Sequence, residues 1–450
     1  MKYSPPPEPV YHLSRLRNGL TVCTFPMPWL HEVGATLLVR AGSRYETEEE
    51  AGIAHFLEHM VFKGTTAIPD PTALHIHLEA LAADMNAATS QEYNAYWITL
   101  PPSFLEEGFA TFCTMFTAPA LRGIDTERQV IVAEMREEEN DQGEITTPAL
   151  LAGTVMWPGH PLARSILGTR ARIAGIDEAA LRRFLARYYC GRNMAVAFFG
   201  PIAHRRALRL TRTALGMLPA GVLSSSPPPP PMPPGPHWVA VNDQTAQLSL
   251  VLYFRTTGFL DANHDALGAM RRILDDGFAS RLQATLRERQ GLVYDLWAAY
   301  TALSDTGCLE VGAAVSPENL EAVFVAIIAQ LAGLCDAPPP DDEWRRVLTR
   351  WQAALMSTLD RPAELMERYV ADRLFAPIET LATAWRRVRA IDPESLPALA
   401  RRLIAPHNMV VVLVGPEARA VLPRLRANWQ TRGETDAKKS GGLQPAGARQ

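Results

Sequence analysis

Residues 193–201 read Asn-Met-Ala-Val-Ala-Phe-Phe-Gly-Pro, and residues 408–416 read Asn-Met-Val-Val-Val-Leu-Val-Gly-Pro. Each segment begins with Asn-Met, continues as an apolar run of strand length and ends in a Gly-Pro turn. An Ile-Asp pair opens a helical stretch before each segment, at Ile176 and at Ile391. Because helix, strand and turn recur with one constant offset of 215 positions, the sequence indicates an internal duplication.

The order of elements around this repeat agrees with two similar halves. We expect a strand at about 33–40 to lead into a helix at about 50–62, and a strand at about 247–254 to lead into a helix at about 263–275. Each half continues with more helix, a β-hairpin-like stretch and several further helices. Because strands and helices do not alternate strictly, the sequence predicts an α+β fold in which a sheet packed with helices is built twice.

A proline-rich stretch separates the two halves. Residues 224–237 contain three serines followed by a run of prolines. Such a run cannot join a helix or a central strand, and it favours extended polyproline II. We therefore expect a first domain at 1–223, a linker at 224–237, a second domain at 238–431 and a disordered polar tail at 432–450.

The composition excludes several classes of protein. Of the 450 residues, 47% are hydrophobic and 20% charged, with a net charge of −4, so large cores are possible and binding to nucleic acid or to a membrane surface is not indicated. We expect no membrane span and no signal peptide, and hence a cytoplasmic location. The cysteines are scattered, which predicts free thiols. The preference for arginine over lysine suggests a GC-rich bacterial source.

The segment His55-Phe56-Leu57-Glu58-His59 lies in the helix expected at about 50–62. His55 and His59 are four residues apart, so their imidazoles leave one helix face and can bind one metal ion. Two histidines and a carboxylate, with a position left for water, form a common catalytic zinc site. Glu58 can lie beside the metal without binding it, which suits a general base. The order H-x-x-E-H is the inverse of the commoner zinc-protease motif.

The third ligand cannot be assigned from spacing alone. Residues 125–139 are expected to form a helix with several acids. Glu127 and Glu134 are seven residues apart and share one helix face, and Glu134 follows an apolar run at the edge of the core. The run Glu137-Glu138-Glu139 is typical of a solvated face. Spacing therefore makes Glu134 one candidate among several acids.

The chain resembles the M16 peptidases, the pitrilysin and mitochondrial-processing-peptidase family, over nearly its whole length. Residues 51–65 are similar to the zinc helix of that family almost letter for letter. The resemblance implies the short-chain type of this family, a LuxS/MPP-like metallohydrolase fold and one Zn²⁺ per chain. It also implies that His55, His59 and Glu134 are the zinc ligands. Glu58 would be the catalytic base, and Glu127 would be a further catalytic acid that supports the site.

Residues 86–96 resemble the strand pair that follows the zinc helices in the family. There an edge strand pairs with the substrate backbone, so the resemblance implies that Asn86 and Ala87 bind substrate. The chain departs from the family pattern at two places. Ala82-Ala83 replaces the usual Gly-Gly, and Asn94 stands where Thr is usual.

In the second half, residues 286–294 indicate an amphipathic helix stopped by Gly291 and followed by a strand, in which Arg287 is a surface charge. The resemblance implies more. Family members that cleave peptides carry an Arg and a Tyr seven residues apart here, which hold the substrate carbonyl and stabilise the tetrahedral intermediate. Arg287 and Tyr294 match this pair as catalytic and substrate-binding residues. Asp275-Asp276-Gly277 replaces the glycine-rich run often found before this segment.

The resemblance leaves three functions open. The first is a zinc-dependent metalloendopeptidase that hydrolyses unstructured peptides in a closed dimeric chamber. The second is a non-catalytic scaffold or assembly subunit, although such relatives lose zinc ligands or the base. The third is a subunit dedicated to one precursor, such as the peptide that yields pyrroloquinoline quinone. Because the chamber needs about twice this chain, we expect a homodimer, or else a heterodimer with an M16 relative.

Overall fold

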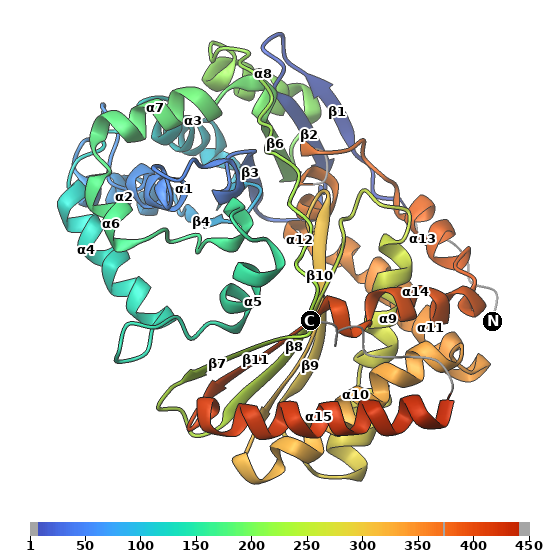
Figure 1. Ribbon diagram of the computed structural model, residues 1–450. Helices are drawn as coiled ribbons and strands as arrows, with labels where there is room; N and C mark the ends of the chain where they lie inside the picture. The colour runs from blue at the N-terminus through green and yellow to red at the C-terminus, as the bar shows by residue number, and fades with distance from the viewer. Residues whose placement is uncertain (1–7, 372–373, 441–450) are drawn as a thin grey trace. The chain divides into compact units, whose positions relative to one another are not determined.

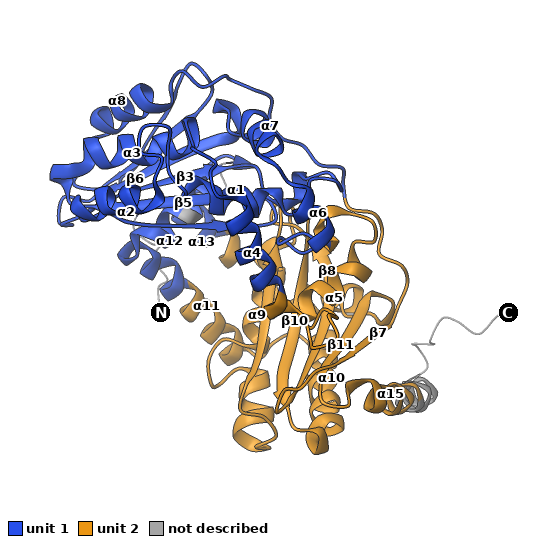
Figure 2. Cartoon of the chain, turned by 90° about the vertical axis from the view of Figure 1, so that its left-hand side faces the viewer, with its two compact units in different colours: residues 1–135, 164–228, 352–386 blue, residues 136–163, 229–351, 387–450 orange. Residues whose placement is uncertain are grey.

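The computed structural model describes residues 8–371 and 374–440. The chain divides into two compact units (Figure 2). Unit 1 is made of the described parts of residues 1–135, 164–228 and 352–386. Unit 2 is made of the described parts of residues 136–163, 229–351 and 387–450. Each unit is an α+β body with its own sheet and helices, as the sequence predicts (Figure 1).

The sheet of unit 1 has six strands in the order β1-β2-β6-β3-β5-β4. Strand β6 is parallel to β2 and antiparallel to β3, and every residue of β6 is buried, as its uninterrupted apolar sequence predicts. Strand β4 lies at one edge and pairs with β5. The strands are β1 (His12–Arg15), β2 (Thr21–Pro26), β3 (Val33–Val39), β4 (Asp84–Thr89), β5 (Asn94–Leu100) and β6 (Met194–Gly200).

The helices of unit 1 pack apolar faces against this sheet to form one core. That core includes Phe56 of α1, Phe109 of α3 and Phe184 of α7, all of which are fully or almost fully buried. The helices are α1 (Ile53–Val61), α2 (Pro71–Ala80), α3 (Leu105–Thr117), α4 (Ile124–Met135), α6 (Arg170–Gly175), α7 (Glu178–Tyr188), α8 (His204–Leu215), α12 (Pro362–Met366) and the greater part of α13 (Leu381–Arg389).

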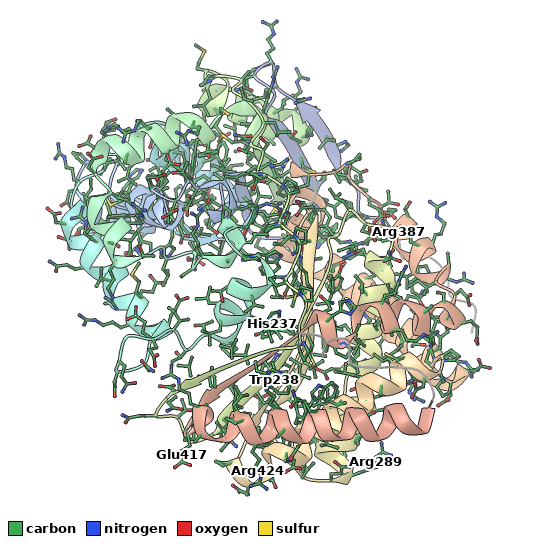
Figure 3. All side chains as sticks on the ribbon, in the orientation of Figure 1. His237, Trp238, Arg289, Arg387, Glu417 and Arg424 are labelled. Carbon is green, nitrogen blue, oxygen red and sulfur yellow. The ribbon has the colours of Figure 1, made fainter. Side chains whose placement is uncertain are left out.

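The sheet of unit 2 has five strands in the order β7-β11-β8-β10-β9. In its core, Trp238, which is labelled in Figure 3, packs against Phe324. Phe324 in turn meets Trp429 edge to face. The strands are β7 (His237–Asn242), β8 (Leu248–Thr257), β9 (Leu296–Ala302), β10 (Thr306–Val315) and β11 (Met409–Gly415). The helices are α5 (Pro148–Met156), α9 (His264–Leu274), α10 (Leu320–Asp336), most of α11 (Asp341–Ser357), α14 (Leu396–Leu403) and α15 (Ala418–Ser440).

The predicted duplication extends to the hydrogen-bonding register of the sheets. In unit 1, Leu37 of β3 lies opposite Val196 of β6 and Tyr96 of β5. In unit 2, Leu252 of β8 lies opposite both Val411 of β11 and Val311 of β10. Each position in the second set is 215 residues after its counterpart, so three strands of each sheet keep the offset that the sequence repeat shows.

The repeated Asn-Met segment has the same local structure in both units. Asn193 donates from Nδ2 to the carbonyl of Tyr188 at 3.2 Å, and Asn408 donates in the same way to Leu403 at 2.8 Å. In each unit this bond joins the start of the strand to the end of the preceding helix. The strand then ends at a glycine with positive φ, which is 112° at residue 200 and 135° at residue 415. The repeat therefore preserves a backbone conformation that is unfavourable for residues other than glycine.

The two units exchange segments across the predicted domain boundary. Residues 136–163, which include α5, belong to unit 2, and residues 352–386, which include α12, belong to unit 1. The proline-rich stretch lacks helix and strand from Ser224 to Pro236, as expected. Of the tail expected at 432–450, the first part belongs to α15, which ends at Ser440, and residues 441–450 lie outside the described part.

One segment, Pro317–Asp336, is long and apolar enough to cross a membrane by length and composition. It consists of α10 and the turn before it. The residues of one α10 face, among them Val323, Ile327 and Leu331, are buried in the core of unit 2. Helix α10 therefore packs as a core helix of a globular body does. Core helices can be as long and as apolar as a membrane span.

Candidate metal centre

The residue just before helix α1, Gly52, must be a glycine. Gly52 has φ of 93°, and a Cβ atom there would lie 2.6 Å from the carbonyl oxygen of Leu167. The buried carboxylate of Glu46 accepts hydrogen bonds from the backbone N–H groups of Gly52 at 3.0 Å and Ala54 at 2.8 Å. It thereby satisfies two N–H groups at the helix start that have no partner within the helix, and it fixes the first turn of α1.

The two histidines of α1 lie side by side, and a carboxylate from α4 faces both. His55 Nε2 and His59 Nε2 are 3.2 Å apart. Glu134 places Oε1 3.7 Å from His55 Nε2 and Oε2 3.7 Å from His59 Nε2. One nitrogen from each ring and one oxygen of Glu134 all lie within 4.8 Å of one another. Two imidazoles and one carboxylate at this spacing are the donor set that suits Zn²⁺.

Helix α4 brings two acids to the centre at different depths. The helix predicted for 125–139 ends at Met135 and continues as a 3₁₀ turn. Ile131 and Met135 are buried, so the helix face that carries them is anchored in the core. Glu134 is 40% exposed, whereas the side chain of Glu127 is 6% exposed. The more accessible acid is therefore the one that faces both histidines.

Glu127 forms a bridge between His59 and Lys63. Its Oε1 lies 2.8 Å from His59 Nδ1, and its Oε2 lies 2.7 Å from Lys63 Nζ. Burial opposes ionisation of Glu127, but the Lys63 ammonium and the His59 ring together hold its pKa below the ordinary value. An ionised Glu127 accepts the Nδ1 hydrogen of His59, which leaves the lone pair of Nε2 for a metal.

His55 is also suited to bind a metal. Burial, reinforced by the neighbouring His59, lowers the pKa of His55 to about 4. The imidazole is therefore neutral at physiological pH, as a metal ligand must be. In the described part of the chain its buried Nδ1 has no hydrogen-bond partner, so only His59 has its ring orientation set by a carboxylate.

Glu58 lies on the same helix but has a different partner. Its Oε2 accepts a hydrogen bond from the hydroxyl of Thr89, the last residue of β4. Burial raises the pKa of Glu58 above its ordinary value, although the Thr89 hydrogen bond and the nearby His59 act in the opposite direction. Glu58 is not among the three residues whose ligand atoms converge. Glu58 therefore lies next to His59 in the sequence without joining the three converging residues, and its role as a base stays a prediction.

The two residues expected to bind substrate in the first half lie on the edge strand. Asn86 is exposed and Ala87 half-buried on β4. Within the described sheet, the far side of β4 carries no further strand. Asn86 Oδ1 accepts a hydrogen bond from the backbone N–H of Ala87 at 2.8 Å. The open side of β4 is an edge of the kind that pairs with an extended peptide, but the backbone N–H of Ala87 is already bonded to Asn86.

The residues expected to act from the second half, Arg287 and Tyr294, belong to unit 2. Arg287 lies on a π-helix, Gln283–Arg289, and β9 begins only at Leu296, so Tyr294 stands in the intervening loop. The Arg287 guanidinium lies 4.9 Å from the centre of the Tyr294 ring and 5.3 Å from that of Phe278. Tyr294 is 82% exposed and Phe278 69% exposed. The Arg and Tyr thus lie together on an accessible surface of their unit.

Three residues of the centre escaped assignment from the sequence: Lys63, Thr89 and Asn94. Each lies within a segment that resembles the family, yet no spacing rule connects Thr89 or Asn94 with the H-x-x-E-H motif. Lys63 is four residues after His59, so the helical period alone could have placed it on the ligand face. Thr89 and Asn94 reach the centre through the hairpin of β4 and β5, which is a tertiary arrangement.

Replacing Glu127 with Gln should weaken zinc binding about 10- to 100-fold. The neutral amide holds the Nδ1 hydrogen of His59 less strongly and no longer pairs with Lys63. Competition with a chromophoric chelator measures the affinity, and Glu79→Gln, an exposed acid on α2, is the matched control. An affinity for zinc unchanged within twofold in Glu127→Gln would show that Glu127 does not support the ligand.

Comparison with known proteins gives one family for both halves. The family described as insulinase, peptidase family M16, matches residues 27–170, and the one described as peptidase M16 inactive domain matches residues 175–350. An uncharacterised zinc protease of Streptomyces coelicolor is 26% identical over 89% of this chain and 88% of its own length. The mitochondrial-processing peptidase subunit beta of Blastocladiella emersonii is 26% identical over 91% of this chain and 89% of its own length.

Solved structures show the same fold. A protease from Helicobacter pylori has a TM-score of 0.83 at 21% identity and covers 91% of this chain and 100% of that structure. A peptidase M16 inactive domain from Pseudomonas fluorescens has a TM-score of 0.80 at 19% identity and covers 90% of this chain and 98% of that structure. Two sheets packed with helices are therefore the shared architecture.

Proposed function

The chain belongs to the M16 peptidase family, whose similar curated members are named zinc proteases, and on this premise we propose that it is a zinc-dependent endopeptidase. One observation carries the proposal. His55, His59 and Glu134 present three convergent ligand atoms, and a fourth residue, Glu58, lies next to a ligand without joining the set. A protein that only stored zinc or served as a scaffold would have no use for this acid.

The proposed mechanism assigns each side chain a step. His55, His59 and Glu134 would hold one Zn²⁺ per chain, and the bound ion would supply the Lewis-acid chemistry that activates water for attack on a peptide bond. Glu58 takes a proton from the attacking water and then delivers it to the leaving amine. Glu127 keeps His59 in the tautomer that leaves Nε2 unprotonated.

The proposed substrates are unstructured peptides. The exposed edge of β4 can pair with an extended backbone, which gives affinity with little dependence on side-chain sequence. Asn86 and Ala87 lie on this strand and would contact the bound peptide. Arg287 and Tyr294 would hold the carbonyl of the scissile bond.

Digestion of a mixed peptide library, read by mass spectrometry, tests this function. The zinc-loaded chain should cut many peptides at internal bonds, and a chelator should abolish the cuts. The His59→Ala chain serves as the matched inactive sample. Absence of cuts by the zinc-loaded wild-type chain would contradict general peptide hydrolysis and would favour a dedicated precursor or a scaffold. Efficient cleavage of stably folded proteins would contradict a closed chamber.

The proposal includes a homodimer in which the partner subunit completes each site. The metal centre belongs to unit 1, and the Arg287 and Tyr294 pair belongs to unit 2. Mixing His59→Ala and Arg287→Ala chains should restore about one quarter of wild-type activity, because half of the dimers are mixed and each contains one complete site. Peptide hydrolysis is measured after verified subunit exchange. A mixture that exchanges subunits and stays inactive would rule out action in trans.

A further inference from the structure

The carboxylate of Glu58 is held from strand β4. Thr89 ends this strand, and its hydroxyl bonds to Glu58 Oε2. Because an ionised carboxylate only accepts hydrogen bonds, the hydroxyl must be the donor. This bond fixes one carboxylate oxygen and leaves the other, Oε1, to exchange a proton. None of the roles proposed above for Glu58 requires Thr89, so this contact is unexplained by the zinc site itself.

Asn94 determines where the Thr89 hydrogen points. Thr89 and Asn94 lie opposite each other in the β4–β5 pair. Asn94 is fully buried, and its Nδ2 donates to Thr89 Oγ1 at 2.7 Å and to the Ala54 carbonyl oxygen at 3.3 Å. A hydroxyl has a single hydrogen, so an oxygen that accepts from Asn94 keeps that hydrogen for Glu58. The amide therefore orients the hydroxyl and also joins the hairpin to the first turn of α1.

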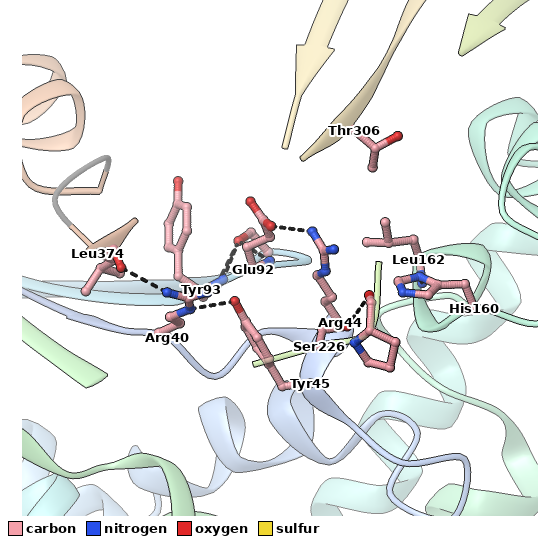
Figure 4. Close-up of polar contacts among 12 residues, drawn as sticks. Arg40, Arg44, Tyr45, Glu92, Tyr93, His160, Leu162, Ser226, Thr306 and Leu374 are labelled. Carbon is pink, nitrogen blue, oxygen red and sulfur yellow. Dashed lines mark hydrogen bonds and ion pairs between the residues drawn. The ribbon is translucent and has the colours of Figure 1, made fainter. Parts of the chain in front are cut away.

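A buried ion pair fixes the turn between the two strands. Arg44 donates from Nη1 to Glu92 Oε1 at 2.7 Å, and both residues are 4% exposed (Figure 4). The backbone N–H of Arg44 also bonds to the carbonyl of Gln91 at 2.8 Å. Arg44 lies in the segment that precedes α1, whereas Glu92 lies in the hairpin turn. The hairpin is thus joined to α1 through Asn94 and to the segment before α1 through Glu92, and Thr89 has little freedom to move away from Glu58.

We propose that Thr89, fixed by Asn94, is a positioning residue that sets the orientation of the Glu58 carboxylate. This inference rests on the proposed function, in which Glu58 is the general base. Strand β4 is also the strand proposed to pair with the peptide. Peptide pairing and base orientation therefore depend on one strand, and a peptide seated along β4 meets a base whose carboxylate is already oriented.

Substitutions that separate the hydroxyl from the shape of the side chain test the proposal. Thr89→Val removes the hydroxyl and keeps the branched shape, whereas Thr89→Ser keeps the hydroxyl. Thr89→Val should lower kcat about 10- to 100-fold with KM within about twofold, and Thr89→Ser should stay within about threefold of wild type. Thr99→Val, at the other end of β5, is the matched control. Zinc content should be the same in all four chains.

Crystal structures of the zinc-loaded wild-type and Thr89→Val chains give a readout that does not depend on activity. The wild type should show one Glu58 conformer bonded to Thr89, and the variant should show a displaced or divided carboxylate. An unmoved carboxylate in the variant, near-wild-type kcat in Thr89→Val, or equal losses in the Val and Ser variants would each overturn the proposal. A zinc-loaded wild type without hydrolysis would instead refute the proposed function, and the crystallographic comparison would still decide the positioning.

Discussion

Replacing Glu58 with Gln should lower kcat by about three orders of magnitude or more while zinc remains bound. A positioned general base raises the reaction rate about 10²- to 10⁴-fold. Because the same residue is proposed to protonate the leaving amine, the substitution removes the group that carries out both proton transfers. The amide keeps the size of the side chain and can still meet Thr89. Because Glu58 is not one of the convergent ligands, zinc content should stay at the wild-type value.

Peptide hydrolysis and elemental analysis of the same preparation measure the two quantities together. Glu79→Gln makes the same chemical change at an exposed position on α2 and should hydrolyse peptide at the wild-type rate. A zinc-loaded Glu58→Gln chain with near-wild-type kcat would exclude Glu58 as the base. Loss of zinc along with activity would instead assign Glu58 a role in metal binding.

Replacing His59 with Ala should remove both the metal and the activity. His59 Nε2 faces Glu134, and its Nδ1 lies 2.8 Å from Glu127 Oε1. Its loss removes one of the three proposed ligands and also leaves the buried Glu127 carboxylate without one of its two partners. Zinc per chain should fall from about one to near zero after dialysis against a weak chelator, and hydrolysis should fall to the background rate.

His75→Ala is the matched control, because His75 is an exposed histidine on the neighbouring helix α2. This control should keep its zinc and its activity. A His59→Ala chain that still holds one zinc per chain against the same chelator would mean that the metal binds elsewhere. Thermal unfolding of both variants shows whether the fold is retained, which separates loss of a ligand from loss of structure.

The fold was predictable where the sequence pattern is local and repeated. The apolar runs that became β6 and β11, with a glycine turn after each, need only their own residues to form a buried strand. Their common offset then predicts a second copy of the sheet. The exchange of α5 and α12 between units was not predictable, because it depends on which distant surface each apolar helix face packs against.

In the candidate site, too, the residues placed by a local pattern were predictable, and those placed by tertiary contacts were not. The positions of His55 and His59 follow from the helical period, and the separation of 3.2 Å between their Nε2 atoms agrees with it. Glu134 lies on a helix distant in sequence, so its selection among several acids depended on the family resemblance. The β4–β5 hairpin brings Thr89 to Glu58 and Asn94 to Thr89, and no sequence pattern predicts these contacts.

Titration of the metal-free wild-type chain with Zn²⁺, while hydrolysis of an unstructured peptide is followed, tests the central claim most directly. The proposed centre predicts that the initial rate rises in proportion to added zinc and stops rising at one zinc per chain. The Glu58→Gln chain should take up the same amount of zinc and remain inactive. Hydrolysis by the metal-free chain, or no hydrolysis once each wild-type chain holds one zinc, would contradict the account.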